Sequence, residues 1–134
     1  MPKGTTTARG TLLVGTATVI EGTALNAPRA CVFEDDETTG YFYAVDISDE
    51  AQPIKDAVLI YNVAQVEDRE RPSIVQIVWS ENDRACVLTI NDYFHAAFDF
   101  EKKIGYARTG FPESGKAGDW SRRHWSDEAL KLFD

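Results

Sequence analysis

Cysteine, histidine and positive charge are all scarce in this chain of 134 residues. The two cysteines, Cys31 and Cys86, occur without a convincing secretory signal, so the sequence predicts reduced thiols and a cytoplasmic protein. The 14 Lys and Arg residues stand against 22 Asp and Glu, and this net charge of −8 argues against nucleic-acid binding, which needs clustered basic side chains. No apolar run approaches the ~20 residues of a membrane-spanning helix. We therefore expect partners other than nucleic acids and membranes.

Residue patterns for metal binding and nucleophilic catalysis are also sparse. The cysteines and histidines lack the Cys-x2-Cys and His-x3-His spacings that transition-metal sites use. Cys86 lies within an apolar run, where a free cysteine usually behaves as a small buried hydrophobic residue. The sequence therefore predicts no cofactor, and it favours a protein that is not an enzyme.

Short segments rich in β-branched and aromatic residues, each bounded by turn residues, dominate the sequence. With 43% hydrophobic residues the chain can form one core, so we expect a single domain over residues 1–134, with residues 1–10 as a flexible amino-terminal tail. The pattern predicts a mainly β fold, at the margin of α+β: a single antiparallel meander of about seven short strands that forms a sandwich or a partly open barrel. The expected strands cover residues 11–20, 30–34, 41–46, 58–63, 73–80, 85–91, 93–100 and 105–109.

Two segments carry helical features. Residues 54–61 place apolar side chains at helical spacing after Pro53, but they also suit a strand, so we expect a helical turn that gives way to a strand. Near the end of the chain, Ser126 is a predicted N-cap, and the two acidic residues after it favour a helix N-terminus. The sequence thus predicts a short C-terminal helix that packs on the sheet.

The acidic residues are concentrated in one part of the chain. Residues 34–56 contain eight acidic side chains and one basic side chain, Lys55, so this segment has a net charge of −7. One interpretation is a pair of solvated turns that keep the protein soluble. The other is an electrostatic face for a basic partner or a cation, because complementary charge speeds association.

Part of this segment has the spacing of a calcium-binding loop. Asp35 and Glu37 lie at alternate positions, Gly40 stands at position six, and Asp46 stands at position twelve. The flanking residues resemble strands, whereas a calcium loop of this type lies between helices. An acidic hairpin loop is therefore the expected structure, with weak cation binding by Asp35, Glu37 and Asp46 as an alternative.

One pair of titratable residues could support proton transfer. Strand alternation along residues 93–100 places Phe94 and the other apolar residues at even positions on one face, and His95 with Asp99 on the opposite face. A carboxylate from Asp99 or Asp92 would raise the pKa of His95. A structural pair is the preferred interpretation, because no nucleophile accompanies it. The alternative, a small-ligand-binding barrel or a weak enzyme, would use Asp92, His95, Asp99 and Arg108.

Tyrosine and tryptophan provide a further resource, because these side chains often anchor protein interfaces. Trp120 and Trp125 flank a short basic stretch, and Tyr41 and Tyr43 follow the first acidic turn. We therefore favour a non-enzymatic acidic protein-interaction module, for example an immunity-type protein that neutralises a basic toxin, and homodimerisation through a sheet edge is compatible with this role. The expected partner-binding residues are Asp35, Asp36, Glu37, Tyr41, Tyr43, Trp120 and Trp125.

Four segments together resemble a known family. They are residues 33–44 (FEDDETTGYFYA), 60–63 (IYNV), 78–80 (VWS) and 95–100 (HAAFDF). These segments are similar to those of a family of small uncharacterised bacterial proteins, known only as a domain of unknown function, and the likeness covers roughly residues 28–125. The resemblance implies a bacterial, stand-alone cytoplasmic domain, and it implies no activity, cofactor or catalytic residue.

Overall fold

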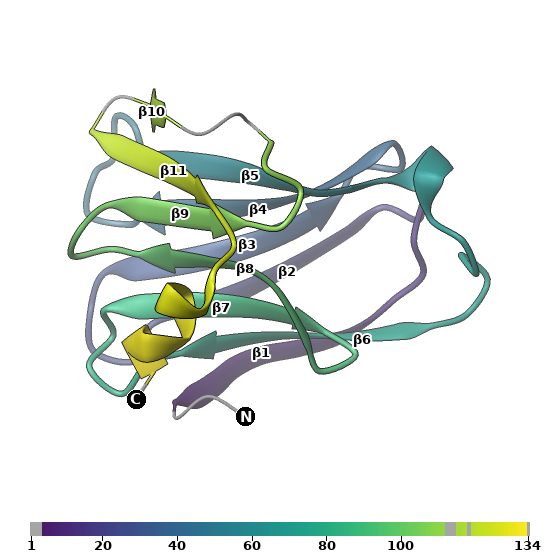
Figure 1. Cartoon of the computed structure of the whole chain (residues 1–134). Coiled ribbons are helices and arrows are strands. Elements are labelled where there is room, and N and C mark those ends of the chain that lie inside the picture. The colour runs from purple at the N-terminus through teal and green to yellow at the C-terminus, as the bar shows by residue number, and fades with distance from the viewer. Residues whose placement is uncertain (1–3, 112–114, 118, 134) are drawn as a thin grey trace.

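The computed structural model describes residues 4–111, 115–117 and 119–133, which form eleven strands and two short 3-10 helices (Figure 1). The elements are β1 (Thr5–Leu12), β2 (Thr18–Thr23), β3 (Arg29–Asp35), β4 (Thr39–Asp46), β5 (Ile54–Asn62), η1 (Val63–Gln65), β6 (Ser73–Trp79), β7 (Ala85–Ile90), β8 (Tyr93–Asp99), β9 (Ile104–Ala107), β10 (Gly115–Ala117), β11 (Trp120–His124) and η2 (Asp127–Phe133). They build a seven-stranded sheet in the order β1-β6-β7-β8-β9-β11-β10 and a four-stranded sheet in the order β2-β3-β4-β5. The fold is therefore mainly β, as predicted, and neither sheet closes into a barrel.

The strand order differs from the predicted single meander. The chain leaves the seven-stranded sheet after β1, forms the four-stranded sheet with β2 to β5, and returns with β6. Each run of consecutive strands pairs antiparallel, but β11 pairs with β9 in parallel. Alternating hydrophobicity predicts individual strands, but it does not specify in which sheet the next hairpin continues.

The amino-terminal segment differs from the expected flexible tail. Residues 5–10 belong to β1, which pairs antiparallel with β6 apart from a register shift between Thr6 and Ala8, while residues 1–3 lie outside the described residues. The expected strand over residues 11–20 is divided into β1 and β2 by a turn. Gly15 lies in that turn with a φ of +91°, a conformation that glycine adopts without strain.

The two segments with helical features have different outcomes. Residues 54–61 contain no helical turn, because β5 pairs with β4 along this whole stretch. The short C-terminal helix is confirmed as η2, a 3-10 helix in which the Ser126 carbonyl accepts a hydrogen bond from the Ala129 N–H at 3.1 Å. Its buried residues, Ala129 and Phe133, pack on the seven-stranded sheet as predicted.

Most large apolar side chains form one core shared by the two sheets. Phe42 of β4 and Phe98 of β8 stack with ring centroids 5.1 Å apart, and the Trp79 indole of β6 donates a hydrogen bond to the Gly22 carbonyl of β2 at 3.1 Å. A second apolar cluster, which includes Phe133, lies on the other face of the seven-stranded sheet, under η2 (Figure 1). In the described part of the chain, no helix covers the outer face of the four-stranded sheet.

Candidate functional site

The side chain of Asp35 is buried and does not contribute to an acidic surface. It is 1% exposed, and its carboxylate accepts hydrogen bonds from the backbone N–H groups of Gly15 and Glu37, both at 2.8 Å. The Tyr61 hydroxyl donates a third hydrogen bond at 2.6 Å, and burial together with this carboxylate raises the pKa of Tyr61. Strand alternation explains the burial, because Asp35 shares the inner face of β3 with Phe33. Asp35 therefore holds the hairpin loop to the core.

The other two acidic residues of this loop, Asp36 and Glu37, are exposed, and only the Asp36 carboxylate bonds the loop backbone. The Asp36 carboxylate accepts hydrogen bonds from the N–H groups of Thr39 at 2.8 Å and Thr38 at 2.9 Å, and these bonds lower its pKa. Glu37 has a φ of +82°, which the tight turn requires. Only Glu37 and the outer edge of Asp36 are left for an external partner, because the loop uses its carboxylates to satisfy its own backbone.

Asp46 lies at the opposite end of the hairpin from Asp35 and Glu37. In the β3–β4 register Asp35 faces Gly40, whereas Asp46 faces Arg29 at the far end. The step from Gly40 to Asp46 along β4 spans about 20 Å, at about 3.3 Å per residue. The structure therefore does not assemble the calcium-like ligand set of Asp35, Glu37 and Asp46, and the acidic segment divides into two clusters instead of forming one face.

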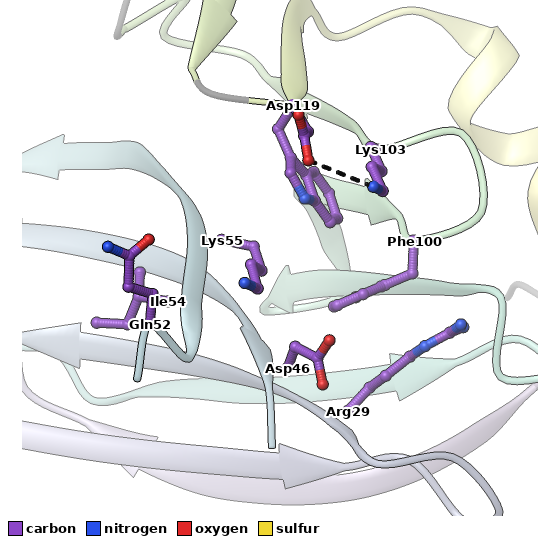
Figure 2. A pocket seen from close by; sticks show the side chains of 9 residues that line it. Arg29, Asp46, Gln52, Ile54, Lys55, Phe100, Lys103 and Asp119 are labelled. Carbon is purple, nitrogen blue, oxygen red and sulfur yellow. Dashed lines mark ion pairs between the residues drawn. The ribbon is translucent and has the colours of Figure 1, made fainter. Parts of the chain in front are cut away.

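Asp46 instead lines a cleft of about 630 Å³ at its end of the molecule, which we call the end cleft (Figure 2). The cleft lies where the β4–β5 connection approaches the turns that precede β9 and β11. Its charged lining residues are Arg29, Asp46, Lys55, Lys103 and Asp119, and its aromatic lining residues are Phe100 and Trp120.

Sequence reasoning did not identify most of this cleft. Its three basic residues are separated by long stretches of chain, and none of them belongs to a recognisable binding motif. Two of its charged residues, Arg29 and Asp46, face each other in the β3–β4 hairpin. A correct prediction of this hairpin's register would have placed these two side chains next to each other. Predicting the cleft required knowing that two sheets meet at this end.

Tyr41 and Tyr43 lie on the outer face of the four-stranded sheet. The register places Val19, Glu34, Tyr41 and Leu59 in one row across the strands, and Glu21, Val32, Tyr43 and Ala57 in the next. We call these eight residues the tyrosine face. Val19 is 65% exposed, so an apolar side chain of the edge strand β2 is open to solvent beside the two tyrosines.

The tyrosine face is ordered by contacts between its own side chains. The rings of Tyr41 and Tyr43 stack with centroids 6.1 Å apart, and the Tyr43 hydroxyl donates a hydrogen bond to the Glu34 carboxylate at 3.3 Å. Burial, and then the nearby charge of Glu34, raises the pKa of Tyr43, so its hydroxyl stays protonated at neutral pH. The face thus combines rigid aromatic rings with two carboxylates, a composition suited to protein recognition.

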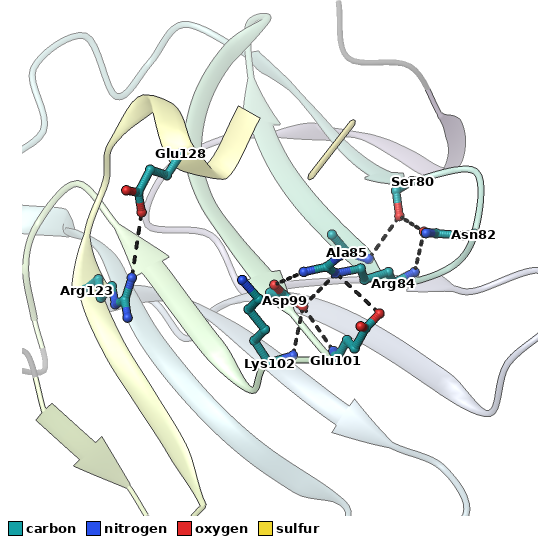
Figure 3. A network of polar contacts seen from close by, with 9 residues as sticks. All are labelled: Ser80, Asn82, Arg84, Ala85, Asp99, Glu101, Lys102, Arg123 and Glu128. Atoms are coloured by element: carbon teal, nitrogen blue, oxygen red, sulfur yellow. Dashed lines mark hydrogen bonds and ion pairs between the residues drawn. The ribbon is translucent and has the colours of Figure 1, made fainter. Parts of the chain in front are cut away.

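Asp99 and Asp92 are not placed to assist His95. Figure 3 shows Asp99, which is fully buried, paired with the Arg84 guanidinium at 3.1 Å. Its carboxylate also accepts hydrogen bonds from the N–H groups of Glu101 and Lys102, both at 3.0 Å, and so closes the turn after β8. Asp92 is exposed in the preceding turn with a φ of +64°. The predicted His95–carboxylate pair is therefore not formed.

The backbone of β8 explains this outcome. The register shifts between Ala96, which faces Leu88, and Phe94, which faces Thr89, so His95 is the extra residue of a bulge. The bulge reverses the alternation, and Phe94 joins the cluster under η2 instead of the central core. Burial, and then the charge of Arg108, lowers the pKa of His95 to about 4, opposite to the predicted increase.

The two tryptophans have separate structural roles. Trp120 is 4% exposed and belongs to the central core, with one side at the end cleft. Trp125 stacks on Phe94 with ring centroids 6.0 Å apart, and the Arg108 guanidinium lies 5.1 Å from its ring and 4.4 Å from the Tyr93 ring. Both tryptophans therefore lie with the seven-stranded sheet, and the structure does not bring them to the tyrosine face.

Two features are absent from the described residues, which have gaps at 112–114 and 118. No helix there is long and apolar enough to cross a membrane. No group of three or more His, Cys, Asp or Glu side chains in that part of the chain is arranged to hold a metal ion.

Comparisons with known proteins identify relatives without a described activity. The profile of the family DUF2251, described as an uncharacterized protein conserved in bacteria, matches residues 12–134. An uncharacterized protein of Haemophilus influenzae is 40% identical over 104 residues, which cover 78% of this chain but only 65% of that relative. No solved structure matches this chain.

Proposed function

The chain belongs to DUF2251, a family of uncharacterized proteins conserved in bacteria, and for this member we propose a non-enzymatic role as a module that binds a basic protein through its tyrosine face. The observation that carries the proposal is the pair of stacked tyrosines beside Glu34 on a sheet face that no described helix covers. An immunity-type protein that captures a basic toxin is one form of this role.

The contrast between the two sheets supports this choice of surface. The outer face of the seven-stranded sheet packs against η2, so its apolar residues, such as Val87 and Ala97, are fully buried. The outer face of the four-stranded sheet instead leaves Tyr41 and Tyr43 only partly buried. Tyrosines in such a position provide contact area at low entropic cost, because each has few rotatable bonds.

The charge of the tyrosine face indicates the kind of partner. Glu21 and Glu34 are the two carboxylates among its eight residues, and these residues include no lysine or arginine. The exposed Glu37 lies at the hairpin end of the same strands and adds negative charge at the rim. A partner that presents lysine or arginine would pair with these carboxylates and stack on the tyrosine rings.

The experiment uses the wild-type protein to capture proteins from a lysate of the source bacterium, after which the captured protein is purified and titrated against defined variants. The double variant Y41S/Y43S removes the aromatic contacts, and E34Q removes one charge. We expect Y41S/Y43S to weaken binding by about 30-fold or more, and E34Q to reduce the salt dependence of the affinity. The matched control is Y93S, because Tyr93 is 55% exposed on the other sheet.

Specific results would overturn this proposal. An acidic partner, or equal binding by wild type and Y41S/Y43S, would exclude a basic protein on this face. Sedimentation of the purified chain tests a second copy as the occupant: a dimer that Y41S/Y43S dissociates would assign the face to self-association instead. Equal weakening by Y93S and Y41S/Y43S would place the binding site elsewhere.

A further inference from the structure

Both lysines of the end cleft are already neutralised within the protein. The Lys55 ammonium pairs with Asp49. The Lys103 ammonium lies 3.6 Å from the Asp119 carboxylate, as Figure 2 shows. A multiply charged anion such as a phosphate ester would therefore meet few uncompensated positive charges here. The remaining charged lining residues decide what the cleft can hold.

Those remaining residues are one guanidinium and one carboxylate side by side. Arg29 and Asp46 are opposite each other on β3 and β4, where side chains lie about 5 Å apart, but among the described residues neither forms an ion pair. Arg29 donates a hydrogen bond to the Asp83 carbonyl at 2.8 Å. Its other N–H groups bond no side chain or carbonyl of the residues that the structure describes, so they can reach a ligand. The Ser48 hydroxyl bonds the Asp46 carboxylate and lowers its pKa, so this carboxylate is ionised at neutral pH.

The apolar side of the cleft is formed by the end of the central core. Phe100 and Trp120 meet edge to face with ring centroids 5.3 Å apart, and they are 8% and 4% exposed. The Arg29 guanidinium lies 5.4 Å from the centroid of the Phe100 ring. The mixed pair of charges therefore stands directly beside an aromatic surface, within a space large enough for a small molecule.

We propose that the end cleft binds a free α-amino acid with an apolar or aromatic side chain. Its carboxylate accepts hydrogen bonds from Arg29, its ammonium donates to Asp46, and its side chain packs against Phe100 and Trp120. An α-amino acid carries both charges on a single carbon, which matches two side chains at directly opposite positions of neighbouring strands. This site is distinct from the tyrosine face and does not depend on the proposed protein partner.

The ligand series provides a test that needs no variant. Isothermal titration calorimetry compares L-phenylalanine and L-leucine with phenethylamine, which lacks the carboxylate, and 3-phenylpropionate, which lacks the ammonium. We expect one or both amino acids to bind and each one-charge analogue to bind at least about ten-fold more weakly, because each loses a charge-assisted hydrogen bond. Glycine should bind more weakly than the apolar amino acids, because it has no side chain to contact Phe100 and Trp120.

Variants then assign the contacts. We expect R29Q and D46N each to weaken amino-acid binding at least about ten-fold, with R29K intermediate because it keeps the charge but loses the planar fork of donors. The matched control is R123Q, which removes an arginine that is 54% exposed and paired with Glu128 outside the cleft. It should bind like wild type. Thermal unfolding of each variant shows that it is folded before titration.

The outcomes decide the proposal in either direction. Binding that needs both charged groups of the ligand and both Arg29 and Asp46 supports it. The absence of heat with L-phenylalanine and L-leucine at millimolar concentration overturns it, as does 3-phenylpropionate binding as tightly as L-phenylalanine. If R29Q or D46N does not fold, the comparison between ligands on the wild-type protein still gives the answer.

Discussion

Replacing Asp35 tests whether the acidic hairpin is a structural anchor or a binding surface. Its carboxylate accepts hydrogen bonds from Gly15, Glu37 and Tyr61 inside the protein. An alanine at this position leaves these three donors without their acceptor and partly shielded from water. Because an unsatisfied buried donor costs about 1–3 kcal/mol, we expect Asp35→Ala to lower the free energy of unfolding by about 3–5 kcal/mol.

The conservative variant Asp35→Asn gives a second measurement, since a loss of about 5 kcal/mol can unfold a small domain. The asparagine oxygen still accepts hydrogen bonds, but its amide nitrogen faces one of the donors, so we expect a loss of about 2 kcal/mol. Urea denaturation followed by tryptophan fluorescence measures both variants. The buried Trp79 reports on the core in this assay.

Two comparisons control this prediction. Asp36→Asn changes the next carboxylate, which is exposed, so it should cost much less than Asp35→Asn. Tyr61→Phe removes one of the three donors, and its cost should shrink in the Asp35→Asn background because the two residues share a hydrogen bond. An Asp35→Ala protein as stable as wild type would refute the anchoring role and restore Asp35 as a candidate for partner binding.

Three further predictions concern other parts of the fold. The unfolded chain takes up a proton on His95 near pH 6.5 and the folded protein only near pH 4, so the free energy of unfolding should fall as the pH falls through this interval, and His95→Gln should flatten that slope in urea titrations. Arg122→Ala leaves Asp56 buried without its partner at 2.8 Å, which should cost about 3–5 kcal/mol at neutral pH. Burial already raises the pKa of Asp56, so this deficit should shrink as the pH is lowered and the carboxyl is protonated. Phe133→Ala should lower the free energy of unfolding by about 3 kcal/mol, because it leaves a cavity between η2 and the seven-stranded sheet. Thermal unfolding measures this loss.

Each of these outcomes has a contrary result. A His95→Gln protein with the same pH slope as wild type would mean that another group titrates in this range. If the loss of stability caused by Arg122→Ala grew as the pH is lowered, the variant would not contain a buried, unpaired Asp56 carboxylate. A Phe133→Ala protein with an unchanged unfolding temperature would mean that η2 is not docked in solution.

Sequence patterns predicted the strands better than their arrangement. The predicted strand 73–80 matches β6 (Ser73–Trp79) almost residue for residue, because its Val and Ile side chains are largely buried between the neighbouring strands β1 and β7. The apolar residues of segment 54–61 fit both helical and strand spacing. The segment forms a strand because it pairs with β4. The return of the chain to the first sheet after β5 is a long-range choice that local patterns do not encode.

The candidate site shows the same limit at the scale of single residues. Asp35 and Asp36 are adjacent acids in one charged run, yet one is buried and the other exposed, because strand alternation turns them to opposite sides. His95 and Asp99 do not form the predicted pair, because His95 is the extra residue of a bulge and Asp99 pairs with Arg84 instead. Tyr41 and Tyr43 were predicted as partner-binding residues, and the structure places both on the open sheet face, where that hypothesis stays testable.

The hairpin of β3 and β4 contributes residues to both proposed binding surfaces, because successive residues of a strand point in opposite directions. Tyr41 and Tyr43 point outward from β4, whereas Asp46 lines the end cleft together with Arg29 from β3. A substitution on one surface therefore leaves the side chains of the other in place, and the two proposals can fail independently. The same alternation gives a different meaning to the net charge of −7 over residues 34–56. Among its acids, Asp35 is a buried anchor, Glu34 lies on the tyrosine face and Asp46 lines the end cleft, so the charge of the segment does not describe any one surface.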